Sequence, residues 1–328
     1  MYIDLVIAWV DGSDPAWQAE KSKYDGSSVG NGACRYRDWV TFKYWFRAVE
    51  KYAPWVRYVY LITWGHVPEW LNLGAEKLRI VTHKEFIPQK YLPTYNSSAI
   101  ELNMHRIKEL SKHFVYFNDD VFLCRPANKT DFFINGKICY PSIGDYLLSR
   151  GNMVSYHKLL SIFSELNEKN NIREGLANNC EKWFSCKYGR SVLKNITLYK
   201  VDGFWGMYHP HLALPVCKQA FFEAWDKYPA IDKTCANKFR SPMDVSHFLI
   251  SIDQMLKGNY IPVDPKTLGK CVALDSTKEI EREFWGQNHK MICFNDSNGY
   301  SEAQVVHINA ELERILSAIF PEKSSFEK

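Results

Sequence analysis

The chain has 328 residues, a formal net charge of +4 and a high aromatic content, with 11 Trp, 19 Tyr and 19 Phe. This length is sufficient for a full hydrophobic core, either in one large domain or in one domain with a substantial insertion. The small and evenly spread charge does not indicate a nucleic-acid-binding protein, although it is compatible with an anionic substrate.

Hydropathy and cysteine usage indicate a cytoplasmic protein. No apolar run approaches the length of a membrane-spanning helix, and Asp4 follows Met1 within a strand-like segment. We therefore expect neither a signal peptide nor a transmembrane anchor. The nine cysteines are scattered and show no paired CxxC spacing, so the sequence predicts neither a zinc site nor a complete disulfide framework.

The first predicted element is a strand over residues 2–10 that stops at an acidic, glycine-containing turn. Open α/β sheets bind their ligands at the carboxyl ends of the strands, so Asp11 and Asp14 are candidate ligand-binding residues. An ordinary Asp-Gly turn is the alternative. Residues 16–34 are polar and rich in glycine, which predicts a mobile loop.

Strand and helix patterns then alternate along the chain. The predicted elements are a helix over 39–52, a strand over 56–63, a turn and short helix over 65–73, and a short strand over 78–82. Such alternation is typical of a largely parallel sheet with helices on both faces.

Residues 93–123 contain the densest set of functional signals. Their pattern predicts a loop, an amphipathic helix over 97–112 and a buried strand over 113–117. Asp119 and Asp120 follow this strand directly. Adjacent carboxylates repel each other, so a bound cation explains them better than packing does. A capped turn that begins the next element is the alternative.

The second half of the chain shows a looser pattern. Asn135-Gly136 predicts a hairpin within 131–140, and residues 150–200 are polar and helical. Further helices are predicted over 214–228, 243–257, 276–286 and 301–319.

Several side chains suited to cation binding, phosphate binding or proton transfer recur at the ends of predicted elements: Asp11, Asp14, Glu101, Asp119, Asp120, His209, His211, Arg240, Asn295 and Asp296. Carboxylate oxygens are the ligands that Mg²⁺ or Mn²⁺ prefers, and Arg matches phosphate oxygens. A His can take a proton from an attacking hydroxyl group. Together these groups favour transfer at a phosphate ester or a sugar nucleotide, although each alone is compatible with a structural role.

Four sequence blocks occur in a specific order over well over half of the chain. They are residues 3–14; residues 35–72, continuing through 92–107 to 116–123; His211-x-x-x-Pro215-x-x-Lys218 with residues 238–241; and residues 292–296 with 320–327. These blocks resemble the Stealth family, which contains bacterial capsular and exopolysaccharide hexose-1-phosphate transferases and the catalytic subunit of the lysosomal-enzyme GlcNAc-1-phosphotransferase. After Arg37, the chain departs from the common pattern at Trp39, Val40 and Thr41, which replace polar and acidic residues.

The resemblance implies that a hexose or N-acetylhexosamine 1-phosphate is transferred from a UDP-sugar to a hydroxyl group of a glycan or lipid-linked acceptor. UMP would be released, and the product would belong to capsule or exopolysaccharide biosynthesis. A lipid-linked acceptor would be compatible with peripheral association at the inner face of the cell membrane.

The resemblance also implies an α/β fold similar to the GT-A glycosyltransferases, with a mostly parallel central sheet flanked by helices. We expect a nucleotide-sugar-binding half over 1–149, a helical insertion or lid over 150–200, and the remainder of the catalytic domain over 201–328.

Residue roles follow from the matching positions. The resemblance places Glu101, Asp120, His211 and Arg240 in the catalytic set. Arg240 is expected to hold the transferred phosphoryl group, and His211 is the preferred general base, with Glu101 orienting or replacing it. His209 is the alternative base, although the spacing to Pro215 and Lys218 favours His211.

Two further sets complete the predicted site. Magnesium or manganese is assigned to Asp119, Asp120 and Asp296. Donor binding is assigned to Asp11, Gly12, Asp14, Arg37, Asn96 and Ser97.

Two other functions are compatible with the same sequence. A metal-dependent GT-A glycosyltransferase would transfer the sugar alone and release UDP, whereas a non-catalytic glycan-binding protein would turn over no nucleotide. Carboxylates at several strand ends count against simple glycan binding, because sugar binding depends more on aromatic rings and amides.

Overall fold

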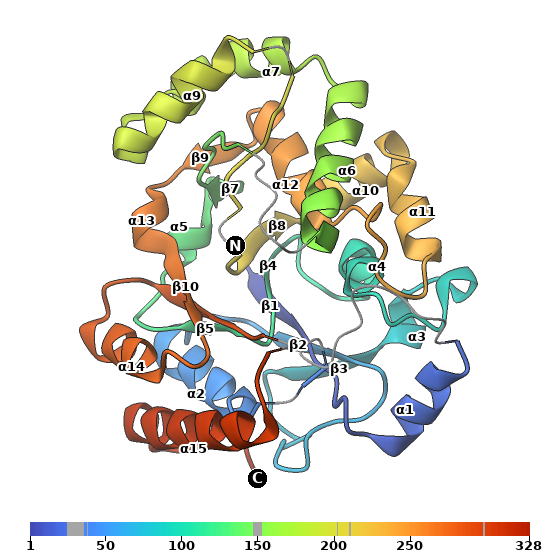
Figure 1. Cartoon of the computed structure of the whole chain (residues 1–328), viewed down its shortest axis with the longest axis vertical. Helices are drawn as coiled ribbons and strands as arrows, with labels where there is room; N and C mark the ends of the chain where they lie inside the picture. The colour runs from blue at the N-terminus through green and yellow to red at the C-terminus, as the bar shows by residue number, and fades with distance from the viewer. Residues whose placement is uncertain (25–35, 38, 147–152, 202, 210, 298) are drawn as a thin grey trace.

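The computed structural model describes residues 1–24, 36–37, 39–146, 153–201, 203–209, 211–297 and 299–328. Its centre is a five-stranded sheet in the order β3-β2-β1-β4-β8 (Figure 1). These strands are β1 (Ile3–Ala8), β2 (Val59–Thr63), β3 (Leu78–Thr82), β4 (His113–Phe117) and β8 (Leu214–Cys217). The first four are parallel, and β8 is antiparallel to β4. The predicted α/β fold with a mostly parallel central sheet is therefore confirmed.

The central strands are apolar on both faces because helices and loops cover both sides of the sheet. Asp4 of β1 is a charged residue within this apolar region, and its side chain is fully buried. Its carboxylate accepts hydrogen bonds from the Arg57 guanidinium at 2.6 and 2.8 Å and from the backbone N–H of Ser111 at 2.7 Å. These bonds satisfy the buried charge and join β1 to the segment before β4.

Two smaller sheets flank the central one. The first has the order β10-β11-β5, formed by Gly269–Ala273, Met291–Asn295 and Val121–Leu123, and the second has the order β6-β7-β9, formed by Phe133–Ile134, Lys137–Tyr140 and Tyr260–Pro262. The second sheet contains the predicted Asn135-Gly136 hairpin, which is confirmed. Because β4 and β5 are separated by a three-residue turn, Asp119 and Asp120 lie where the chain passes from the central sheet to the first smaller sheet.

Fifteen α-helices are present in the described residues: α1 (Pro15–Ser22), α2 (Phe42–Tyr52), α3 (His83–Phe86), α4 (Ser97–Asn103), α5 (Lys129–Phe132), α6 (Met153–Lys169), α7 (Ile172–Asn178), α8 (Cys180–Trp183), α9 (Val192–Tyr199), α10 (Lys218–Lys227), α11 (Ala230–Ala236), α12 (His247–Leu256), α13 (Pro265–Leu268), α14 (Thr277–Gly286) and α15 (Glu302–Ile319). Helices α6, α7 and α9 lie at the opposite end of the molecule from α14 and α15 (Figure 1). Helices α6 to α9 fall within the predicted insertion, whose first boundary lies outside the described residues. No helix in the described ranges has the length and apolar content of a membrane span.

Two predicted helices are wrong in part. The helix expected over 97–112 ends as α4 at Asn103 and continues only as a 3₁₀ turn over Met104–Arg106. The Asn103 amide donates to the carbonyl oxygen of Ala99 at 2.8 Å, which competes with the helical backbone bonds. The first four residues of the helix expected over 214–228 form β8 instead, because Leu214 to Val216 pair with β4.

Two other segments also differ from expectation. The predicted loop over 16–34 begins as α1, since the Asp14 side chain accepts a hydrogen bond from the backbone N–H of Trp17 and caps the helix. Residues 25–34 of that loop lie outside the described residues. The short helix expected over 65–73 is absent from this described segment, where turns and an isolated bridge between Leu71 and Glu327 occur instead.

Candidate active site

The turn after β1 is a tightly bonded loop. The Asp11 carboxylate accepts hydrogen bonds from the Ser13 backbone N–H at 2.8 Å and the Ser13 hydroxyl at 2.6 Å. The Asp11 backbone N–H donates to His66 Nε2 at 2.8 Å, which ties this loop to the segment after β2. A Cβ atom on Gly12 would lie 2.0 Å from the Tyr36 carbonyl oxygen, so only glycine permits this close approach.

A pocket beside this edge combines several of the predicted site residues. Its lining consists of Trp9, Arg37, Trp39, Thr41, Phe42, Asp119, Asp120, Leu274, Phe294 and Asp296. The backbone N–H of Phe294 donates to the Asp120 carbonyl oxygen at 2.8 Å, which holds β11 against the Asp119-Asp120 turn. Asp11, Gly12 and Asp14 lie in the neighbouring loop after β1, outside this set of lining residues.

Asp120 has a buried carboxylate oxygen, Oδ1, that makes no hydrogen bond to the described residues. Burial raises the pKa of Asp120, although His211 and a hydrogen bond with the Cys293 thiol oppose that rise. Such an atom is unusual, because more than about nine in ten buried polar groups are paired. It is therefore suited to an external ligand.

Asp296 is held differently from Asp120, because both of its carboxylate oxygens already accept hydrogen bonds. Arg37 Nη1 donates to them at 2.8 and 3.0 Å, and Trp39 Nε1 donates at 3.1 Å. Trp39 is one of the residues at which the sequence departs from the common family pattern. Here its indole N–H helps to hold the Arg37–Asp296 pair on the pocket wall.

A second group of charged residues surrounds Glu101. This buried carboxylate accepts a hydrogen bond from His247 Nδ1 at 2.7 Å. The prediction that Glu101 orients His211 or replaces it as the base stays a prediction, and the observed partner of the Glu101 carboxylate is His247 at the start of α12. Sequence reasoning missed His247 because a single His on an apolar helix carries no signal of its own.

The charge of Glu101 is compensated from several sides. Burial opposes its ionisation, but the nearby charges of His247, Lys158 and Arg240 outweigh that effect, so the pKa of Glu101 is lowered. The Lys158 ammonium also donates a hydrogen bond to the Ser98 hydroxyl, which lies at the start of α4. At neutral pH this group is therefore an ionised, paired carboxylate rather than a free base.

Arg240 lies beside this group with part of its guanidinium unsatisfied. Its Nη2 donates to the Ser97 hydroxyl at 3.0 Å, whereas its buried Nε has no hydrogen-bond partner among the described residues. Asn96, which is fully buried, caps α4 and donates to Asp244 Oδ2 at 2.8 Å. Asp244 in turn accepts from the backbone N–H of Ser241 at 2.8 Å. Asn96 thus holds the segment that carries Arg240.

The two histidines of the His209-Pro210-His211 sequence have different environments. Burial, followed by the neighbouring His211 and His247, lowers the pKa of His209 to about 3. Its Nδ1 accepts a hydrogen bond from the His211 backbone N–H at 3.1 Å. The His211 side chain is exposed, and its backbone is in the left-handed region with φ of 45°. His209 is therefore neutral near pH 7, whereas His211 is the exposed imidazole of the two.

The buried Tyr116 hydroxyl group is influenced by the charges of both groups. Burial is the main cause of its pKa being raised well above the ordinary value, and the carboxylates of Glu101, Asp119 and Asp120 raise it further. The positive charge of Arg240 opposes them. Glu101, Asp119, Asp120 and Arg240 are therefore within electrostatic reach of one buried hydroxyl group of β4, and His211 is within reach of Asp120.

The sequence also matches known protein families. Residues 1–29 match conserved region 1 of the Stealth proteins, and residues 35–139 match conserved region 2. Capsular polysaccharide phosphotransferase WcwK of Streptococcus pneumoniae is 40% identical over 332 residues, which cover 99% of this chain and 99% of that protein. The chain belongs to the Stealth family.

Other Stealth relatives match over similar lengths. Receptor polysaccharide phosphotransferase WefC of Streptococcus oralis is 34% identical over 99% of each chain. Exopolysaccharide phosphotransferase cps2G of Lactiplantibacillus plantarum is 36% identical over 99% of this chain and 96% of that protein. Among solved structures, galactosyltransferase LgtC is similar with a TM-score of 0.40 and 9% identity, over 96% of this chain and 95% of that one.

The buried Glu101 carboxylate leads to a pH-dependent prediction for stability. Since its pKa in the folded protein lies below its ordinary value of 4.5, its ionised form stabilises the fold above that pH. This stabilisation is lost as the pH falls through the folded-state pKa. Glu101→Gln should therefore melt at a lower temperature than the wild type at neutral pH, and the difference should shrink below about pH 4.5.

Differential scanning calorimetry across this pH range measures the effect. Glu322→Gln, at an exposed position after the end of α15, is the matched control and should follow the wild type throughout. A melting difference for Glu101→Gln that stays constant with pH would contradict the lowered pKa.

Proposed function

We propose that this Stealth protein is a phosphotransferase that moves a sugar 1-phosphate from a UDP-sugar to a hydroxyl group of a glycan or lipid-linked acceptor, with release of UMP. The names of relatives that match over nearly their full length support a phosphotransferase of capsule or exopolysaccharide biosynthesis. The UDP-sugar donor, the acceptor and the released nucleotide are parts of the proposal.

One structural observation carries this function. Asp120 Oδ1 and Arg240 Nε are both buried and both lack a hydrogen-bond partner in the described ranges. One is an acceptor on an acidic side chain and the other is a donor on a cation. A metal-bound diphosphate would satisfy both, because the cation would contact Asp120 and the phosphate oxygens would accept from Arg240.

The acidic residues fit a hard divalent cation. Asp119 and Asp120 supply adjacent carboxylates, and the unsatisfied Asp120 Oδ1 is available as a ligand. The oxygens of Asp296 are engaged by Arg37 and Trp39, so we place Asp296 as a positioning residue for Arg37. A bound Mg²⁺ or Mn²⁺ would neutralise negative charge on the diphosphate and on the departing UMP.

The proposed transfer forms one phosphorus–oxygen bond and breaks another. The acceptor hydroxyl oxygen attacks the phosphorus that bears the sugar, and the bond from this phosphorus to the bridging oxygen breaks. The bridging oxygen leaves with UMP, and the hydroxyl proton passes to His211. Arg240 binds the nonbridging oxygens of the transferred group, where charge is spread in the transition state.

The other residues around Arg240 position it for this role. Ser97 accepts from its Nη2, and the Glu101–His247 pair places a compensated negative charge nearby. A fixed guanidinium loses little side-chain freedom when it binds a phosphate, so this arrangement favours tight positioning of the reacting group.

Product analysis tests the proposed reaction. The protein is incubated with a panel of UDP-sugars, Mg²⁺ and candidate acceptor glycans, and the products are analysed by nucleotide chromatography and phosphorus NMR. We expect UMP and a phosphodiester in equal amounts, both of which EDTA abolishes and added Mg²⁺ restores. Release of UDP with a phosphate-free glycan would contradict phosphotransfer and identify a glycosyltransferase.

Asp120→Asn tests the assigned metal ligand. Loss of this charge should lower kcat by about 10²-fold or more, which is the usual range for removal of one electrostatic contact to the transition state. Asp226→Asn, which changes an exposed aspartate of α10, is the matched control and should keep the wild-type rate. Circular dichroism checks that both variants fold. Near-normal turnover by folded Asp120→Asn would contradict the assignment.

A further inference from the structure

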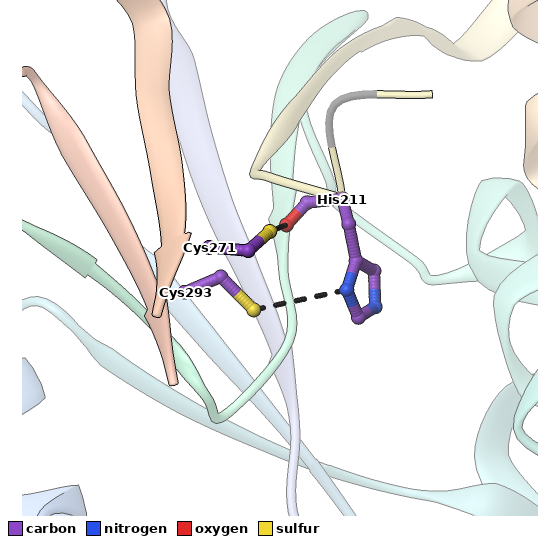
Figure 2. Close-up of side chains that lie close together, drawn as sticks. All are labelled: His211, Cys271 and Cys293. Atoms are coloured by element: carbon purple, nitrogen blue, oxygen red, sulfur yellow. Dashed lines mark hydrogen bonds between the residues drawn. The ribbon is translucent and has the colours of Figure 1, made fainter. Parts of the chain in front are cut away.

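A His and two Cys side chains form a cluster next to Asp120. His211, Cys271 and Cys293 place one imidazole nitrogen and two sulfur atoms within 4.8 Å of one another. Figure 2 shows the His211 imidazole facing the Cys293 sulfur, and the distance from Nδ1 to Sγ is 3.7 Å. The sequence prediction of no zinc site rested on the absence of paired CxxC spacing, whereas these ligands come from three separate segments.

The two sulfur atoms are brought together by strand pairing. Cys271 of β10 and Cys293 of β11 are directly paired in register in a parallel ladder, so their side chains lie on the same face of the sheet. This arrangement depends on the fold and not on spacing along the chain. It sets two thiols side by side at the edge of the proposed catalytic pocket.

His211, the third ligand, is positioned by hydrogen bonds of its backbone N–H and carbonyl groups. The His211 N–H donates to His209 Nδ1, and the His211 carbonyl oxygen accepts from Cys271 Sγ at 3.9 Å (Figure 2). The left-handed backbone at His211 carries a conformational cost for a residue with a side chain. These contacts hold its imidazole close to the two sulfur atoms.

We propose that His211, Cys271 and Cys293 form a three-ligand binding site for a thiophilic divalent cation of the Zn²⁺ class, with the fourth position left to water. Tetrahedral zinc with bonds of about 2.3 Å to sulfur and 2.0 Å to nitrogen places these ligand atoms roughly 3.5 Å apart. The observed 3.7 Å between Cys293 and His211 needs little adjustment. Asp120 contacts the Cys293 thiol and has a buried oxygen without a partner in the described ranges.

This site is chemically distinct from the proposed magnesium site. Mg²⁺ prefers oxygen ligands, whereas thiolate and imidazole ligands favour Zn²⁺ and similar cations. The thiophilic site uses His211 and lies next to Asp120. If the proposed function is correct, a thiophilic cation removes the proposed general base from the transfer reaction. The consequence is inhibition of the enzyme by Zn²⁺ in the presence of excess Mg²⁺.

Cobalt binding tests the site without any need for turnover. Fully reduced protein is titrated with Co²⁺ under nitrogen, and absorbance is recorded for the sulfur-to-cobalt charge-transfer band and the visible bands of tetrahedral cobalt. We expect one equivalent of Co²⁺ to produce both bands and Zn²⁺ to remove them. Cys271→Ser and Cys293→Ser should each lose most of the charge-transfer intensity.

Cys180→Ser is the matched control, because Cys180 is also an exposed cysteine outside any disulfide but is not part of the cluster. It should give the wild-type spectrum. Absence of the bands in the reduced wild type, or their persistence in both cluster variants, would overturn the proposed site. Because Cys271 is exposed, Cys271→Ser keeps the test decisive if Cys293→Ser fails to fold.

Inhibition provides the second measurement. The free Zn²⁺ concentration for half-inhibition, relative to each variant's own uninhibited rate, should rise by about 10-fold or more in Cys271→Ser, because even loss of outer contacts weakens metal sites by that factor. Cys180→Ser should match the wild type. Equal inhibition of Cys271→Ser and wild type would contradict the prediction that Zn²⁺ inhibits transfer by binding at this cluster. A normal cobalt spectrum without UMP formation would instead contradict the proposed function alone.

Discussion

The site depends on two buried polar atoms that the described protein leaves without hydrogen bonds, Asp120 Oδ1 and Arg240 Nε. An unsatisfied buried polar group costs about 1–3 kcal/mol, and more when the group is charged. Such atoms persist only where the surrounding structure holds them firmly. The Phe294 bond to the Asp120 backbone and the Ser97 bond to Arg240 provide that support. The fold thus keeps an acidic atom and a basic atom ready for a ligand that carries both a cation and phosphate oxygens.

The architecture explains why residues far apart in sequence meet there. Strand β4 ends in the central sheet, and after one short turn β5 joins a different sheet with β10 and β11. The Asp119-Asp120 turn therefore faces residues from the last third of the chain. Helix α4, the segment before α12 and the start of α12 bring Glu101, Arg240 and His247 near Tyr116.

Much of the fold could be predicted from local patterns. Strands β1 to β4 are short, largely apolar segments, and α2, α14 and α15 follow helical periodicity, so hydrophobic spacing was sufficient for each. Strand β8 was missed because Leu214 to Val216 merge with the helical pattern of α10. Its identity depends on pairing with β4, which local sequence does not encode.

The same limit applies to the site. The position of Asp119 and Asp120 at a strand end was enough to predict them as site residues. Arg37 and Asp296, which were also predicted as site residues, line the same pocket. The partner of Glu101 and the pairing of Cys271 with Cys293 could not be predicted, because both arise from contacts between distant segments. Asp296 was assigned as a metal ligand from its residue type and its place at the end of a predicted element, whereas its bonds to Arg37 and Trp39 require coordinates.

A crystal structure of the protein with UDP and Mg²⁺ is the most direct test of the central claim that one ligand satisfies both buried atoms. We expect the cation to contact Asp120 Oδ1 and a diphosphate oxygen to accept a hydrogen bond from Arg240 Nε. UDP bound with its diphosphate away from both residues, in a crystal where Asp120 and Arg240 keep their present positions, would contradict that claim.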